Sequence, residues 1–231
     1  MKLQTLICVL SVTTFCGCSS STPSEKDAAK AAPSATGSKS PVVAKVVDAR
    51  PIIAAFGDSL TAGAGVAENE NYPFYMQQLL DERGVQYRVV NHGLSGDTTS
   101  GGVDRVPQVL ADKPKIVVLE LGGNDGLRGI PVATTLANFE AIIEKLQASG
   151  AKVVLAGITL PRNYGEDYIK DFDAMFKTLA QKYKLPFIPF FLENVALVPG
   201  MMQQDGIHAT AKGNKVVAFT VFRKVEMLTE K

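Results

Sequence analysis

Five short apolar segments follow one another along the chain after Pro51, and glycine, proline or asparagine bounds them. Their short length and their β-branched residues favour buried strands. The longer stretches between them carry apolar residues three and four positions apart, as Phe139, Ile142 and Leu146 do, and this spacing is typical of amphipathic helices. The pattern predicts strands at 51–56, 87–91, 115–121, 152–158 and 186–191, and helices at 72–83, 99–112, 134–149, 167–183 and 210–229.

Strands and helices that alternate in this way form a parallel sheet with helices on both faces. We therefore expect an α/β fold in which residues 49–231 form one domain, and the apolar share of 46% suffices for one sizeable core. In such folds, binding sites lie at the carboxyl ends of the strands. The segments that follow the strands are therefore where the chemistry is expected.

The first 48 residues follow neither pattern. Residues 1–17 combine an early lysine with an apolar core of about eleven residues, which is typical of an export signal and too short to span a membrane comfortably. The sequence "CGC" at 16–18 resembles a bacterial lipoprotein processing site, which implies that Cys18 becomes the lipid-bearing first residue. The alternatives are a simply cleaved signal and an uncleaved anchor. Residues 18–48 are rich in serine, alanine, proline and lysine and are expected to form a flexible linker.

Composition excludes several classes of function. The formal net charge is +1 and the basic residues are spread along the chain, so no nucleic-acid partner is expected. All three cysteines lie within the first eighteen residues, so the rest of the chain has neither a disulfide framework nor a cysteine-based metal site. The chain has no phosphate-binding P-loop pattern.

The segments after the strands carry the groups of a nucleophilic enzyme. Ser59 follows the first strand, Asn124 follows the third, and Asp205 and His208 precede the last helix. A serine hydroxyl needs an adjacent base, and histidine suits that role near neutral pH. The chain has two histidines, so the base is His92 or His208, and Asp205 lies three residues before His208, where it can orient the imidazole.

Four sequence blocks then resemble one known family. "FGDSLTAG", "NHGLSGDTT", "LELGGNDGLRG" and "DGIHAT" occur in the order found in the GDSL, or SGNH, hydrolases, and "LPRNYG" and "IPFFLENVA" resemble the bacterial thioesterase, arylesterase and lysophospholipase group. The resemblance implies a flavodoxin-like, three-layer α/β/α fold with a central parallel five-stranded sheet. It implies Ser59 as nucleophile, His208 as base and Asp205 as its orienting acid. It also implies an oxyanion hole made by the backbone N–H groups of Ser59 and Gly96 and by the amide of Asn124.

The resemblance implies hydrolysis of a small-molecule ester or thioester through an acyl-enzyme, without metal or cofactor. The alternatives are a carbohydrate O-acetylesterase and a lipoprotein that binds an acylated ligand without turnover. We expect a monomer in the bacterial cell envelope, periplasmic and lipid-anchored. The serine at position 19, directly after the modified cysteine, favours the outer membrane.

The surroundings of the expected site leave roles open. The apolar residues near the third and fourth strands either line an acyl groove or anchor loops on the core: Leu127, Ile130, Leu160, Pro161 and Tyr164. Asp58 is expected to cap a helix that starts at Ser59. Asp97 and Asp125 are expected to fix loops, and Arg128 either is solvated or meets an anionic head group.

Two residues depart from the family pattern. Ala209 stands where proline is frequent, which should loosen that turn. Thr159 stands where a larger or charged residue is common, which leaves the acyl-chain preference open.

Overall fold

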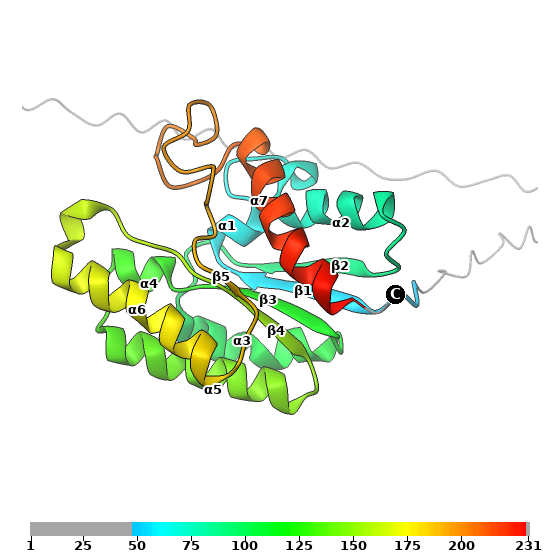
Figure 1. Cartoon of the computed structure of the whole chain (residues 1–231), viewed down its shortest axis with the longest axis horizontal. Coiled ribbons are helices and arrows are strands. Elements are labelled where there is room, and N and C mark those ends of the chain that lie inside the picture. The colour runs from blue at the N-terminus through cyan, green and yellow to red at the C-terminus, as the bar shows by residue number, and fades with distance from the viewer. Residues whose placement is uncertain (1–47, 230–231) are drawn as a thin grey trace, which may run out of the picture. The chain divides into compact units, whose positions relative to one another are not determined.

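A five-stranded parallel sheet between two layers of helices forms the centre of the computed structural model, which describes residues 48–229 (Figure 1). The strands are β1 (Ile52–Gly57), β2 (Arg88–Gly93), β3 (Ile116–Glu120), β4 (Lys152–Ala156) and β5 (Phe187–Ile188), in the spatial order β2-β1-β3-β4-β5. All neighbouring strands are parallel. The predicted α/β fold with its parallel sheet is therefore confirmed. The predicted signal at 1–17, the lipid-bearing Cys18 and all but the last residue of the predicted linker lie outside the described residues.

Two strands differ from the prediction. β5 has only two residues, because the chain leaves the sheet at Pro189. β2 is half-buried along its length rather than buried, since it lies at the edge of the sheet and has a neighbour on one side only. The inner strands β1 and β3 are fully buried, as expected for a parallel sheet with both faces covered.

The long helices form the two outer layers. α2 (Tyr72–Glu82) and α7 (Ala211–Val225) pack together on one face, and α3 (Thr99–Ala111), α5 (Val132–Ala148) and α6 (Glu166–Lys182) cover the other (Figure 1). α5 begins two residues before its predicted start. α7 ends earlier than predicted, because the chain tightens into a 3₁₀ turn, η3 (Glu226–Leu228). None of the helices described has the combination of length and apolar composition needed to cross a bilayer.

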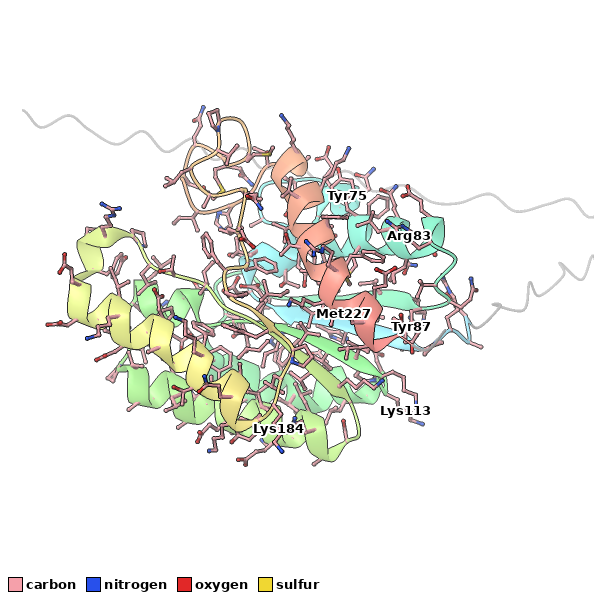
Figure 2. All side chains as sticks on the ribbon, in the orientation of Figure 1. Tyr75, Arg83, Tyr87, Lys113, Lys184 and Met227 are labelled. Carbon is pink, nitrogen blue, oxygen red and sulfur yellow. The ribbon has the colours of Figure 1, made fainter. Side chains whose placement is uncertain are left out.

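Two short helices and one long irregular segment follow the strands at the carboxyl edge of the sheet and have no long apolar pattern. α1 (Ser59–Ala62) follows β1, and α4 (Gly123–Leu127) follows β3. The segment 189–210 joins β5 to α7 and is the orange loop of Figure 1. The opposite, amino edge is marked in Figure 2 by Tyr87 and Lys113, which come before β2 and β3. The expected site residues thus follow the strands at one edge.

Candidate active site

Ser59 lies in a tight turn at the end of the buried strand β1. Asp58 caps the helix that Ser59 begins, because its Oδ1 accepts the N–H of Leu60 at 3.0 Å, as the sequence predicts. Gly63 ends the same helix with a φ of +84°, in the left-handed region that glycine adopts without strain. The serine therefore begins a helix of only four residues that is held between a capped start and a glycine end.

His208 and Asp205 meet Ser59 from the segment before α7. His208 Nε2 lies 2.9 Å from Ser59 Oγ, and His208 Nδ1 lies 2.7 Å from Asp205 Oδ2. The other oxygen of Asp205 accepts the backbone N–H groups of Ile207 and His208 at 2.9 and 3.0 Å. The hydrogen bonds from the backbone and side chain of His208, with that from Ile207, lower the pKa of Asp205 to about 2. Asp205 is therefore ionised throughout the neutral range, and it holds both the turn and the imidazole.

The second histidine is engaged elsewhere. His92 Nε2 lies 2.8 Å from Asp112 Oδ2 at the end of α3. The backbone carbonyl of His92 accepts a hydrogen bond from Arg105. His208 is therefore the histidine that lies within hydrogen-bonding distance of Ser59.

Gly96 and Asn124 lie in the wall of the same cavity as Ser59 and His208. Asn124 Nδ2 donates to Asp58 Oδ2 at 3.1 Å, so the residue before Ser59 orients this amide. Gly96 has a φ of +81°, and its carbonyl accepts a hydrogen bond from Arg128 Nη2 at 2.8 Å. Arg128 is exposed, as one of the two expectations had it, and it also holds the Gly96 peptide.

Buried carboxylates support these loops. Burial raises the pKa of Asp58 to about 6, although its hydrogen bonds from Leu60 and Asn124 act in the opposite direction. Asp97 accepts from Arg105 Nε at 2.8 Å, and Asp125 accepts the backbone N–H of Thr99 at 2.9 Å. Both aspartates therefore fix loops, as predicted.

A largely apolar cavity of about 830 Å³ opens beside Ser59. Of the residues expected in an acyl groove, Leu127, Leu160 and Pro161 line it. Tyr164 is not among its lining residues, because its hydroxyl donates to the Leu127 carbonyl at 3.2 Å and so anchors a loop. Ile130 also lies outside the lining, so the loop-anchoring alternative, and not the acyl groove, describes Tyr164 and Ile130.

The sequence pattern missed one wall of the cavity. Segment 189–210 contributes much of it: Phe190, Leu192, Ala196, Leu197, Met202 and Ile207. This segment has neither a strand nor a helix period, so no periodic signal marks its inward side chains. In the described part of the chain, no group of three or more histidine, cysteine, aspartate or glutamate side chains is arranged to hold a metal ion.

Comparison with known proteins gives the family. The GDSL-like lipase/acylhydrolase family matches residues 55–216. The esterase TesA of Pseudomonas aeruginosa is 48% identical over 153 residues, which cover 66% of this chain and 76% of that protein. The thioesterase 1/protease 1/lysophospholipase L1 of Escherichia coli K12 is 36% identical over 173 residues, which cover 74% of this chain and 82% of that protein.

A crystal structure of TesA has the same architecture. It matches with a TM-score of 0.74 at 42% identity and covers 77% of this chain and 99% of the solved chain. The similarities make this protein an esterase. The chain belongs to the GDSL-like lipase/acylhydrolase family, the SGNH hydrolases, so the resemblance drawn from its four sequence blocks is confirmed.

Proposed function

We propose that this esterase hydrolyses carboxylic esters or thioesters through Ser59, His208 and Asp205 by way of an acyl-enzyme. The observation that carries the proposal is the continuous chain of short contacts from Asp205 through His208 to Ser59, at 2.7 and 2.9 Å. A serine is activated when a base within hydrogen-bonding distance is itself oriented by a third group. The residues that would supply the oxyanion donors, Ser59, Gly96 and Asn124, all line the cavity beside this chain of contacts, which supports the proposal.

In the first step, Ser59 Oγ attacks the acyl carbonyl carbon while His208 Nε2 takes the hydroxyl proton. The carbonyl oxygen becomes an oxyanion, which the backbone N–H groups of Ser59 and Gly96 and the Asn124 amide stabilise. The Asn124 amide has two hydrogens, so one can stay on Asp58 while the other faces the oxyanion. The imidazolium then gives its proton to the leaving alcohol or thiol, and the acyl group remains on Ser59.

In the second step, water replaces the serine as nucleophile. His208 takes a proton from the water as the water oxygen attacks the acyl carbon. The second tetrahedral intermediate collapses, Ser59 Oγ leaves and recovers the proton from His208, and the carboxylic acid departs. Asp205 stays ionised throughout and stabilises the positive charge on the imidazole.

The substrate is proposed to carry an apolar acyl chain. The cavity beside Ser59 is lined mainly by aliphatic and aromatic side chains, an environment that favours hydrocarbon over sugar. The relatives named esterase and thioesterase 1/lysophospholipase L1 support the same class of substrate. A carbohydrate O-acetylesterase is the second candidate, because it would use the same three residues. The intact Ser59–His208 contact disfavours a role in ligand binding without turnover.

We also propose that the enzyme works in the bacterial cell envelope as a monomer. The support is in the sequence, where residues 1–17 have the pattern of an export signal and Cys18 follows a lipoprotein-like processing site. Lipid attachment at Cys18 would hold the domain at a membrane.

The first experiment compares the purified protein with Ser59→Ala on p-nitrophenyl esters from acetyl to palmitoyl. We expect turnover by the wild type and a loss of at least about a thousandfold in the variant, as is typical when a member of such a triad is removed. Rising kcat/KM with chain length would support the apolar acyl substrate, whereas activity confined to acetyl esters would favour the acetylesterase. A folded wild type without turnover on any ester would contradict the proposal.

A further inference from the structure

Glu120 is a buried acid that the proposed mechanism does not use. It is the last residue of β3 and is 1% exposed. The register of the sheet sets it beside Gly57, two residues before Ser59. Its Oε2 accepts a hydrogen bond from Thr61 Oγ1 at 2.8 Å, and Thr61 lies on the same four-residue helix as Ser59. The carboxyl group therefore lies directly behind the turn that carries the nucleophile.

The surroundings of Glu120 disfavour a negative charge. The groups that face it are Thr61 from α1, Tyr72 from α2 and the carboxylate of Asp58, and in the described part of the chain it forms no ion pair. Its Oε1 is buried without a hydrogen-bond partner in the described residues. Burial chiefly, and then the charge of Asp58, raise the pKa of Glu120 well above its ordinary value. These surroundings therefore favour the protonated, neutral form of the Glu120 carboxyl group.

The packing around the carboxyl group is close. A Cβ on Gly57 would lie 2.6 Å from Glu120 Oε2, so the acid fills the space that a side chain at position 57 would need. One turn of helix has little stability of its own, because the first turn fixes several dihedral angles for a single hydrogen bond. α1 is held at its start by the Asp58 cap and, through Thr61, by Glu120. Both attachments act on the short helix that Ser59 begins.

We propose that Glu120 acts as a neutral carboxylic acid and is a positioning residue that fixes Ser59 through its hydrogen bond with Thr61. The proposal rests on the nucleophilic role proposed for Ser59. Glu120 does not touch substrate. It holds the short helix in the orientation that keeps Ser59 Oγ within reach of His208 Nε2.

The test compares two replacements of similar size. Glu120→Gln is neutral and keeps an oxygen for Thr61, so its kcat at pH 7 should stay within about threefold of wild type. Glu120→Leu cannot accept a hydrogen bond, so its kcat should fall by about tenfold, the rate equivalent of one neutral hydrogen bond, while KM stays within about twofold. Wild-type kcat in the leucine variant would overturn the proposal. An equal loss in both variants would also overturn it, since that result means that a neutral hydrogen-bond acceptor at position 120 does not suffice.

Thr61→Val provides a matched second variant, because it keeps the shape of threonine and removes the hydroxyl. We expect the same loss of kcat as in Glu120→Leu. The double variant Thr61→Val/Glu120→Leu should lose no more than either single variant, since the two side chains act through one hydrogen bond. Additive losses would overturn the link between Glu120 and Ser59 through Thr61.

The pH dependence of stability tests the neutral state without any substrate. The folded-state pKa of Glu120 lies above its unfolded value of about 4.3, so the folded protein keeps a proton that the unfolded chain releases. This contribution is fully present below the unfolded pKa and is lost as pH rises through the folded pKa. Glu120→Gln has no such proton, so its Tm relative to wild type should increase from pH 5 to pH 9. A Tm difference that stays constant between pH 5 and pH 9 would overturn the proposal that Glu120 is a neutral acid.

This measurement also separates the two proposals. If Ser59→Ala keeps full turnover, the proposed function fails, while the Tm difference between Glu120→Gln and wild type still decides the protonation state of Glu120.

Discussion

The two walls of the active site are built in opposite ways. The buried wall consists of Asp58 and Ser59, which line the cavity, and of Thr61 and Glu120, which are packed behind them at the ends of β1 and β3. Its three residues other than Ser59 are at most 2% exposed. The open wall is segment 189–210, which carries Asp205 and His208 and also the fully exposed Leu197. Sheet register, a helix cap and a buried acid fix Ser59. A local turn fixes His208, because the Asp205 carboxylate accepts two backbone N–H groups and lies within hydrogen-bonding distance of the imidazole.

Because the two walls are built differently, substitutions in one should mainly change the stability of the protein and substitutions in the other should mainly change its activity. A change in the buried wall disturbs close-packed atoms, so it should lower the free energy of unfolding. A change at an exposed residue of the open wall removes few packing contacts, so it should alter activity or substrate choice with little effect on stability.

Asp205→Asn should give the largest effect on activity. The asparagine cannot stabilise the charged imidazole or hold its required tautomer, so kcat should fall by about a thousandfold or more. The side chain lies at the exposed surface, so the Tm should change by no more than about 2 °C. The measurements are ester hydrolysis and thermal unfolding by circular dichroism. Glu193→Gln, on an exposed acid of the same segment, is the matched control and should leave both unchanged. A large fall in Tm for Asp205→Asn would contradict the expectation that changes in the open wall affect activity but not stability.

Gly57→Ala should give the largest effect on stability. The added Cβ would meet Thr61 and Glu120 at closer than ordinary contact, and both are held by their mutual hydrogen bond. Overpacking of this kind typically lowers the free energy of unfolding by about 1–3 kcal/mol. Urea unfolding measures the loss. An unchanged midpoint would mean that the buried wall is loosely packed, and would remove the physical basis of the comparison.

Leu197→Gly should give the smallest change in stability, and this change should be an increase rather than a decrease. Leu197 has a φ of +62°, lines the cavity and is 100% exposed, so glycine should relieve backbone strain of about 1 kcal/mol while removing a contact for the acyl chain. We expect the variant to be as stable as the wild type or more stable. Its kcat/KM should be about threefold lower than that of the wild type on palmitoyl esters and unchanged on acetyl esters, because the Leu197 side chain can contact only a long acyl chain.

Leu197→Asn is the control for this variant, because asparagine tolerates the same backbone conformation and is polar. It should show the same selective loss on palmitoyl esters. An equal loss on acetyl and palmitoyl esters in either variant would show that Leu197 does not select chain length.

Sequence periodicity predicted the parts of the fold in which burial repeats. The inner strands and the five long helices start and end within a few residues of the predicted bounds, because each presents a regular apolar face to the core. Burial of β2 was wrongly predicted, since its apolar residues do not reveal that it lies at an edge. β5 is shorter than its apolar run, because "PFIPFF" contains a second proline that cannot donate to the ladder.

The sequence predicted the residues of the two walls to different extents. Ser59, Asp205 and His208 were expected together, and the structure brings them within hydrogen-bonding distance. Glu120 could have been singled out, because an acid inside an apolar strand needs a specific partner. The cavity residues of segment 189–210 could not, since their inward direction depends on an irregular backbone that has no period.

Both ends of the described chain lie at the amino edge of the sheet. The described chain begins at Asp48, four residues before β1, and Lys152 at the start of β4 donates to the Leu228 carbonyl beyond α7 at 3.0 Å (Figure 1). Ser59 lies beyond the six residues of β1, a rise of about 20 Å. A domain immobilised by either end would therefore direct its cavity away from the support. The two ends of the described chain and Ser59 are thus separated by the full depth of the sheet.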